Sequence, residues 1–258
     1  MDTKVARHST PRVHRIRATL DLVTTVMVFV AAVAVIAVAS RNWLNGPAVA
    51  RRSAPQVKTP DAAQSLDGAT RLGSRQAPVA LVIYSDFECP FCGKFAAETW
   101  PSIKKDYVAT DKVQVVFRHL PLTIHQHARD ASLNADCAAK QNKFWEVHDV
   151  FFQHQRELTS DRLRAMAEQS GVELSAFDEC LAHNSGDVQR DLDSASRLGI
   201  NSTPTFLVGR VQKNGTVKVA EVLMGAKPLQ AFRRSLDPLL IASGTADVKN
   251  ARYSGHSF

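Results

Sequence analysis

The feature that most constrains the fold is a short apolar run followed closely by two cysteines. Pro78–Tyr84 is continuous, apolar and rich in β-branched residues, which predicts a strand buried on both faces. Cys89 and Cys92 follow this run and are separated by Pro90 and Phe91. Proline suits the first position of a helix, because the N–H group that it lacks has no helical partner there. The sequence therefore predicts a cysteine pair at a strand-to-helix junction, which is typical of a redox-active pair.

The expected position of Cys89 favours its ionised form. At a helix N-terminus, unpaired backbone N–H groups and the positive end of the helix dipole stabilise a thiolate. Cys92 would lie one turn along and further inward, within reach of a mixed disulfide formed by Cys89. We therefore expect Cys89 to be the nucleophile and Cys92 the resolving thiol. Asp86 and Glu88 are candidates for proton transfer, and the alternative is that they are solvated loop acids.

Zinc binding and inert burial are the alternative interpretations of the cysteine pair. A structural zinc site commonly uses two such pairs, whereas the other two cysteines of this chain, Cys137 and Cys180, are isolated in the sequence. His119, His125 and His127 flank a predicted loop, but no cysteine or carboxylate partner lies near them in the sequence. We expect no metal, and no cofactor other than a redox-active disulfide formed by the cysteine pair.

The rest of the pattern predicts a small α/β sheet with a helical insert. A helix and a second strand follow the cysteine pair, and this order implies a right-handed crossover. Residues from about 124 to 198 carry almost only helical signals, and two strands joined through Asn214-Gly215 follow them. After the first strand, the expected elements are helices at Pro90–Tyr107, His125–Gln153, Asp161–Gln169, Leu174–His183, Val188–Leu198 and Pro228–Leu240, and strands at Val113–Arg118, Thr205–Val208 and Val217–Leu223.

A proline stands immediately before the predicted strand Thr205–Val208. Pro204 cannot donate a hydrogen bond to a sheet ladder, so it belongs at the first residue of a strand or at an edge. Together with the upstream cysteine pair, it predicts a cis Thr203–Pro204 peptide bond that presents the backbone of Thr203 to an extended substrate beside Cys89. The alternative is an ordinary trans proline that opens a strand, which is the more frequent form of an X–Pro bond.

The N-terminal 40 residues predict a membrane anchor. Leu22–Ser40 is uncharged and mostly apolar, and its first 18 residues would span roughly 27 Å as a helix, near the thickness of a hydrocarbon core. Five basic residues precede this segment, which indicates that the N-terminus stays inside and the rest of the chain is exported. The alternative is a cleaved signal peptide, since Ala37-Val38-Ala39 and Ala48-Val49-Ala50 both have the small-x-small form of a cleavage site.

The charge distribution agrees with this topology and argues against nucleic-acid binding. The chain has 258 residues and a formal net charge of +7. Residues 1–76 carry 11 Lys and Arg against 4 Asp and Glu, whereas residues 77–258 carry 21 of each kind. The excess positive charge therefore flanks the apolar segment, and the folded body is neutral. We expect no nucleic-acid partner, because such a partner needs a basic patch on the folded body.

These signals divide the chain into five parts. The expected parts are a basic cytoplasmic segment at 1–21, a transmembrane or signal-anchor helix at 22–40, a linker at 41–68, a folded domain at 69–242 with its helical insert at about 124–198, and a disordered tail at 243–258. The linker is indicated by three prolines and by the lack of an apolar period. The folded domain is expected to begin with a short strand near Ala69–Leu72.

Three stretches of the sequence carry a family resemblance. They are Phe87-x-Cys89-Pro90-Phe91-Cys92, Cys137-x-x-x-Gln141-x-x-Phe144-Trp145-x-x-His148 and Thr203-Pro204-Thr205-Phe206. With these motifs the sequence resembles the DsbA-like branch of the thioredoxin superfamily, the exported thiol–disulfide oxidoreductases, over roughly residues 70–240. In plain thioredoxins the proline is much nearer to the cysteine pair in the sequence. Here 112 positions separate Cys92 from Pro204, and the helical insert of DsbA-like proteins would account for this distance. The resemblance implies a thioredoxin fold with an inserted helical domain, a nucleophilic first cysteine and a substrate-binding cis-proline.

Two positions depart from the pattern of this family. Many relatives have a histidine between the two cysteines that helps to hold the thiolate, whereas this chain has Phe91. Phe91 supplies no charge, so the motif alone does not imply a strongly oxidising potential. Thioredoxins and several relatives also have a buried acid six positions before the first cysteine, and this chain has Ile83 there.

The two remaining cysteines both fall in the predicted insert. Some DsbA-like proteins carry a second disulfide in the helical domain, and leftover cysteines in exported proteins commonly pair. We therefore expect a structural Cys137–Cys180 disulfide that stabilises the insert and does not turn over. The alternative is two buried thiols that act as small apolar side chains.

The resemblance also implies an activity, partners and a location. We expect a single-pass protein of the bacterial cytoplasmic membrane, with its N-terminus inside and its catalytic domain in the periplasm or extracytoplasmic space. It would oxidise cysteine pairs in reduced or unfolded exported proteins through Cys89 and Cys92, and a membrane quinone-linked thiol reoxidase would accept the electrons. The alternatives are a disulfide reductase or isomerase of the same fold, a thioredoxin-fold chaperone or adaptor for unfolded exported proteins, and metal delivery through the cysteine pair.

Overall fold

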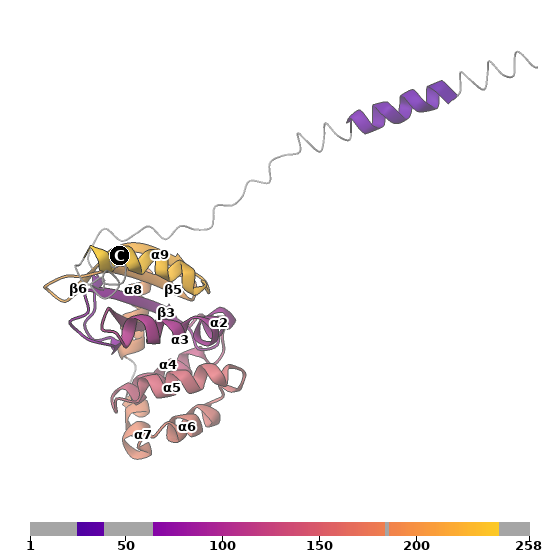
Figure 1. The fold of residues 1–258 in the computed structure, drawn as a ribbon. Coiled ribbons are helices and arrows are strands. Elements are labelled where there is room, and N and C mark those ends of the chain that lie inside the picture. The colour runs from indigo at the N-terminus through magenta and orange to yellow at the C-terminus, as the bar shows by residue number, and fades with distance from the viewer. Residues whose placement is uncertain (1–24, 39–63, 184–185, 243–258) are drawn as a thin grey trace, which may run out of the picture. The chain divides into compact units, whose positions relative to one another are not determined.

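The structure is a computed structural model that describes residues 25–38, 64–183 and 186–242 (Figure 1). The chain divides into two compact units, Met1–Gln56 and Val57–Phe258. The second unit contains the sheet and the cysteine pair.

The described part of the predicted membrane segment is helical. Residues 25–38 form a helix whose side chains are exposed. Within the described ranges, no helix is both long enough and apolar enough to cross a membrane. The two ends of the predicted span at 22–40 lie outside the described residues, as do the predicted segments 1–21 and 243–258 and most of the predicted linker at 41–68.

The second unit is built on a six-stranded mixed sheet with the order β1-β6-β5-β3-β4-β2. The strands are β1 (Gln64–Ser65), β2 (Thr70–Leu72), β3 (Val79–Ser85), β4 (Val113–His119), β5 (Thr205–Val211) and β6 (Thr216–Met224). β3 and β4 are parallel, with Ser85 opposite His119, whereas β5 is antiparallel to both β3 and β6. The carboxyl ends of β3 and β4 therefore lie at the same edge of the sheet, where the chain turns into the cysteine pair.

Helices connect and cover the strands. They are α2 (Pro90–Glu98), α3 (Trp100–Ile103), α4 (Ala128–Ala139), α5 (Phe144–Gln153), α6 (Ser160–Gln169), α7 (Leu174–His183), α8 (Gly186–Arg197) and α9 (Leu229–Ile241), with a π-helical turn at Lys104–Val108 and a 3-10 turn at Gln155–Glu157. In Figure 1, α4 to α7 are grouped together, and α9 lies apart from them. Within the insert between β4 and β5, α4 to α7 thus form a helical unit of their own, whereas α8 packs on the sheet.

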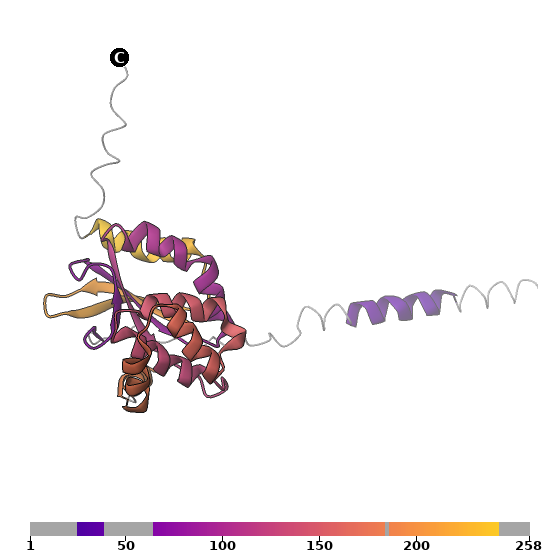
Figure 2. The ribbon, with the colours of Figure 1, turned by 90° about the horizontal axis from the view of Figure 1, so that it is seen from below.

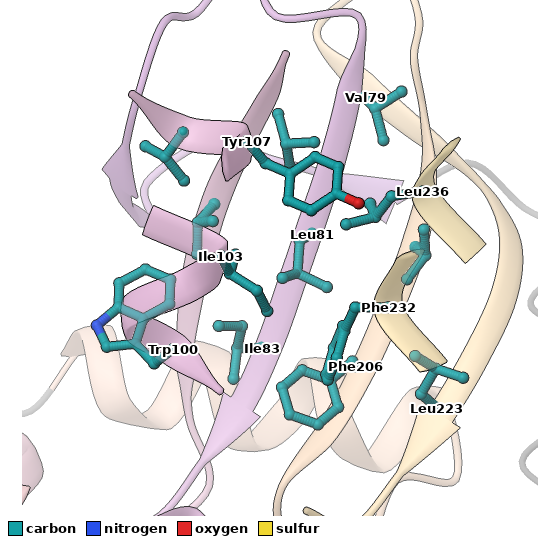
Figure 3. Close-up of a cluster of buried hydrophobic side chains, with 14 of the residues drawn as sticks. Val79, Leu81, Ile83, Trp100, Ile103, Tyr107, Phe206, Leu223, Phe232 and Leu236 are labelled. Carbon is teal, nitrogen blue, oxygen red and sulfur yellow. The ribbon is translucent and has the colours of Figure 1, made fainter. Parts of the chain in front are cut away.

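The side chains of β3 alternate between two apolar cores. Val79, Leu81 and Ile83 point into the first core, which they share with α2, α3, β5 and α9 (Figure 3). Helix α9 lies beside α2 and α3 in this layer (Figure 2). The ring centroids of Phe95 of α2 and Phe232 of α9 are 5.5 Å apart. The even-numbered side chains of β3 pack on the other face against α8 and the segment that follows it. All seven residues of β3 are buried, which the continuous apolar run predicted.

The helical insert has a third apolar core and is joined to the sheet by buried polar pairs. Phe87 and Phe117 pack into this core together with side chains of α4 to α7. At the end of β4, Arg118 Nη1 donates to Asp191 of α8 at 2.8 Å. The neighbouring His119 Nε2 lies 3.0 Å from a carboxylate oxygen of Asp136 in α4. Because these groups are buried, each pair fixes the insert against one particular strand end.

The helix predicted at Pro90–Tyr107 is interrupted. α2 ends at Glu98 and α3 begins after Thr99. The cause is Pro101, which lacks the N–H group that would bond the carbonyl of Ala97 and whose ring clashes with that carbonyl. The prediction of one continuous helix is therefore wrong at this position.

The single helix predicted at His125–Gln153 is also wrong. α4 ends at Ala139, and a turn leads into α5 at Phe144. Asn142 in this turn has a positive φ of 59°, a conformation that asparagine tolerates better than most residues and that ends a helix. A further difference is β1, which lies within the predicted linker at 41–68 and pairs with β6. A strand of two residues is too short to leave a period-2 pattern.

Candidate active site

The cysteine pair lies at the N-terminus of α2, directly after the turn that leaves β3. Cys89 is the N-cap residue with an extended backbone, and Pro90 lies in the first turn of the helix. The backbone N–H of Gly93 donates to the carbonyl of Cys89 at 3.1 Å, which is the first helical hydrogen bond. Cys89 and Cys92 are both buried free thiols, whereas Phe91 between them is 59% exposed. The structure thus describes the reduced pair, with one apolar side chain in solvent beside it.

The surroundings of Cys89 lower the pKa of its thiol. The hydrogen bond that lowers the pKa of Cys89 most is donated by the thiol of Cys92, whereas burial of the Cys89 side chain raises the pKa. Hydrogen bonds from the Thr203 side chain and from the backbone N–H groups of Cys92 and Phe91 lower it further, and the resulting pKa is about 5. The Thr203 hydroxyl is buried and has no other partner among the described residues, so it is free to donate to the thiolate. At neutral pH the Cys89 side chain is therefore ionised and nucleophilic.

The surroundings of Cys92 raise the pKa of its thiol. Its side chain is 1% exposed, and this burial raises its pKa well above the ordinary value, with the hydrogen bond and charge of Cys89 acting in the same direction. The Ser85 side chain and the backbone of Asp86 oppose the shift through hydrogen bonds to Cys92. Cys92 therefore keeps its proton when Cys89 has lost its own. Sequence reasoning missed Ser85, whose only signal is a polar residue at the end of a buried apolar strand.

The Thr203–Pro204 peptide bond is cis and lies against the cysteine pair. The sulfur of Cys89 is 3.4 Å from the carbonyl oxygen of Thr203, to which the protonated thiol donates. Two further hydrogen bonds hold this loop, because the Thr205 hydroxyl donates to the Ser202 carbonyl and the Gly225 N–H donates to the Pro204 carbonyl, each at 2.7 Å. Two motifs that are far apart in the sequence therefore meet at one sulfur atom.

Asp86 and Glu88, the predicted proton-transfer residues, hold a neighbouring loop. Asp86 is fully buried and accepts hydrogen bonds from the N–H groups of Glu88 and Leu122 at 2.8 Å each and from Nδ1 of His125 at 2.7 Å. Glu88 accepts from the N–H of His127 at 2.5 Å. The interpretation as a solvated loop acid is therefore wrong for Asp86. No described contact joins either carboxylate to a sulfur atom, so a part in proton transfer stays a prediction.

The three histidines considered as metal ligands have different partners. His119 faces Asp136, His125 faces Asp86, and the backbone of His127 is bound by Glu88. Within the described part of the chain, no group of three or more His, Cys, Asp or Glu side chains is arranged to hold a metal ion.

Comparison with known proteins assigns this fold and cysteine pair to a family. A thioredoxin family model, Thioredoxin_4, matches residues 65–224, which is more than half of the chain. The chain belongs to the thioredoxin family. Two solved structures resemble it. The structure of alpha-DsbA1 of Wolbachia pipientis has 25% identity and a TM-score of 0.60, and the match covers 70% of this chain and 94% of that chain. BdbD of Bacillus subtilis in its oxidised form has 22% identity and a TM-score of 0.61 over 70% of this chain and 97% of its own, and it shows the same fold.

This thioredoxin-family chain also matches one part of a much longer protein. The Na(+)/H(+) antiporter NhaA 3 of Salinispora tropica is 40% identical over 163 residues, which are 62% of this chain and 24% of the antiporter. The chain therefore spans about a quarter of the length of the curated relatives that it matches.

Family and structure together define the class of reaction. The domain is a DsbA-like thiol–disulfide oxidoreductase of the thioredoxin family. Proteins of this type use a redox-active disulfide rather than an external cofactor, and here Cys89 and Cys92 are the free pair of cysteines.

The other two cysteines of this thioredoxin-family domain form a disulfide. Cys137 of α4 is bonded to Cys180 of α7 across a separation of 43 residues, with a Cα–Cα distance of 5.7 Å. The bond lies within the apolar core of the insert, where Cys137 is fully buried. It joins two helices of the insert and leaves the free pair on α2 as the exchangeable thiols.

The ionisation of Cys89 predicts how the stability of the reduced protein depends on pH. The pKa of Cys89 in the folded protein is about 5, below the ordinary thiol value of 9.0. Ionisation of Cys89 therefore stabilises the folded reduced form, fully above pH 9, and this stabilisation is lost as the pH falls through 5. We expect the unfolding temperature of the reduced protein, relative to the oxidised one, to fall as pH is lowered from about 9 to about 5 and to level off below. Thermal unfolding of both forms across this range measures the difference, and a difference that is independent of pH contradicts the assignment.

Proposed function

We propose that this protein oxidises cysteine pairs in exported proteins and works while tethered to the bacterial cytoplasmic membrane. The observation that carries the proposal is the set of hydrogen bonds around the Cys89 sulfur, which lowers the pKa of its thiol to about 5. Reduction of the disulfide releases Cys89 as a thiolate, and a thiolate stabilised in this way makes the disulfide the stronger oxidant. The hydrogen bonds from Cys92, Thr203 and the helix N-terminus supply this stabilisation without a histidine between the cysteines.

The proposed reaction begins with the oxidised Cys89–Cys92 pair. A substrate thiolate attacks the sulfur of Cys89, so that a mixed disulfide forms and the bond to Cys92 breaks. Cys92 then takes up a proton, which its raised pKa favours. A second substrate thiolate attacks the substrate sulfur of the mixed disulfide and releases Cys89 as a thiolate, a good leaving group because of its low pKa. Two electrons pass from the substrate to the enzyme, and the substrate keeps the new disulfide.

The cis-proline loop is the proposed binding site for the substrate strand. The carbonyl of Thr203 lies 3.4 Å from the sulfur of Cys89, so a chain that hydrogen-bonds to the Thr203 backbone would hold its own cysteine beside the nucleophile. Reduced or unfolded exported proteins offer such extended segments. Pro204 fixes the direction in which the Thr203 backbone is presented.

Membrane tethering is supported by sequence and by relatives. The apolar segment at 22–40 follows five basic residues, which favours a single span with the N-terminus inside and the domain at 69–242 on the extracytoplasmic side. The curated relatives are named as Na(+)/H(+) antiporters, which are membrane proteins, so homologous domains occur in membrane-bound chains. Turnover then requires an acceptor for two electrons, and a membrane quinone-linked thiol reoxidase is the proposed partner.

An assay of reaction direction tests the proposal. The oxidised protein should catalyse loss of free thiols from a reduced, unfolded secretory protein and should reduce insulin much more slowly. The Cys89→Ser variant is the control in both assays. Rapid insulin reduction without thiol oxidation would instead support the disulfide reductase or isomerase alternative.

A further inference from the structure

Gln155 hydrogen-bonds the turn that carries Cys89. This residue begins the 3-10 turn that follows α5, so it belongs to the helical insert. Its Nε2 group donates to the carbonyl oxygen of Phe87 at 2.6 Å and to the carbonyl oxygen of Cys89 at 2.8 Å. Both N–H bonds of the side-chain amide are used in this way. One side chain of the insert therefore fixes two peptide groups of the active-site turn, and one of them is that of the nucleophile.

Gly93 of α2 provides the room for this contact. A Cβ atom at position 93 would overlap Oε1 of Gln155 and would lie 3.0 Å from its Cδ atom. Gly93 does not have the positive φ that favours glycine, so its backbone does not require a glycine. Alanine is also the better helix former in the interior of a helix. The close approach of Gln155 is therefore the structural reason for a glycine at this position.

We propose that Gln155 is a positioning residue for the thiol chemistry of Cys89, and that the absence of a side chain at Gly93 leaves the space for its amide group. The carbonyl of Cys89 accepts both the Gln155 amide and the N–H of Gly93, so its peptide plane is held from two sides. This plane begins α2, and the N–H groups of Phe91 and Cys92 that stabilise the Cys89 thiolate belong to the same helical turn. The inference rests on the proposed role of Cys89 as the nucleophile.

The contact can be removed without removing the packing between insert and turn. Phe87 also contacts the insert through its ring, whose centroid lies 5.4 Å from that of Phe151 and 5.0 Å from that of Phe152. These ring contacts do not involve Gln155. A substitution of Gln155 therefore isolates the two hydrogen bonds, while the apolar contacts keep the insert in place.

Titration of Cys89 in variants of the full chain tests the proposal. Thiolate absorbance near 240 nm of the reduced protein should give a half-titration point that is higher by about 0.5–1 pH unit in Gln155→Ala, since two hydrogen bonds that orient the turn are lost. Gln155→Glu should shift it at least as far, because the side chain keeps its length but the carboxylate has no N–H to donate. Gln153→Ala, a change of an exposed glutamine at the end of α5, should leave it unchanged. Gln155 variants that titrate like the wild type would overturn the proposal.

A double substitution separates positioning from general damage. Gly93→Ala should displace Gln155 and raise the half-titration point as Gln155→Ala does. The double variant should match either single variant and not their sum, and it should be thermally more stable than Gly93→Ala because the overlap has gone. Additive shifts would contradict the coupling of the two positions. The titration does not depend on the direction of thiol–disulfide exchange, so rapid insulin reduction by the wild-type protein would contradict the proposed oxidase function but not the role of Gln155. A wild-type protein in which Cys89 does not titrate near pH 5 would contradict the role of Gln155 as well, because that role requires a stabilised Cys89 thiolate.

Discussion

Replacing Cys89 with serine should reduce the rate of thiol–disulfide exchange to the uncatalysed level. The expected loss is at least about 1,000-fold, because a serine hydroxyl neither attacks a disulfide nor leaves from one, and the nucleophile has no substitute. Cys137 and Cys180 cannot replace it, since they are bonded to each other in the core of the insert. Stopped-time alkylation of free thiols in a reduced substrate protein measures the rate.

Cys92→Ser is the matched control for this prediction. The variant keeps the Cys89 nucleophile but lacks the resolving thiol. With a disulfide-bonded substrate protein, the Cys89 thiolate should attack the substrate disulfide and release one substrate thiolate, and the resulting mixed disulfide should accumulate and be visible on a non-reducing gel. Cys89→Ser should form none. Exchange that persists in Cys89→Ser would show that another group carries the chemistry, and it would favour the chaperone or adaptor alternative.

Removal of the Cys137–Cys180 disulfide should have the largest effect on stability. The bond closes a loop of 43 residues between α4 and α7. By the loop-entropy argument, its loss from the Cys137→Ala/Cys180→Ala variant should lower the free energy of unfolding by about 4 kcal/mol. For a domain of this size, that corresponds to a fall in unfolding temperature of roughly 8–16 °C.

The same variant should retain the chemistry of the free pair. Cys89 receives its hydrogen bonds from Cys92, Thr203 and the backbone of α2, none of which belongs to the disulfide. We therefore expect its half-titration point to stay near pH 5. Added phosphine reductant should destabilise the Cys89→Ser/Cys92→Ser protein and should not affect that protein once Cys137 and Cys180 are also replaced. If the free energy of unfolding of the Cys137→Ala/Cys180→Ala variant fell by less than about 1 kcal/mol, the result would contradict a stabilising role of the disulfide.

Local sequence signals predicted most elements of the fold. The apolar run at β3 is buried on both faces, and α7 has its predicted ends at Leu174 and His183. The two wrong helix predictions came where a single residue interrupts a helical pattern. Pro101 divides α2 from α3, and the turn around Asn142 divides α4 from α5. Apolar periodicity continues across such breaks because the flanking helices pack on the same cores.

The covalent chemistry of the site could be read from the sequence better than its hydrogen bonds. Cys89 and the Thr203–Pro204 bond carry motifs that are recognisable alone, and the structure brings them together. Ser85 and Gln155 carry no motif, because a hydroxyl at a strand end or an amide after a helix can point in many directions. Their roles depend on packing between the insert and the sheet, which periodicity does not specify.

The reduction potential of the Cys89–Cys92 pair is the most direct test of the central claim that this is an oxidase. Equilibration with glutathione redox buffers, followed by alkylation of the remaining thiols, gives the value while the Cys137–Cys180 bond stays closed. The low pKa of Cys89 predicts a potential above about −180 mV, toward the value of about −120 mV known for DsbA. A potential near −270 mV, as in thioredoxin, would contradict the claim and identify a reductase.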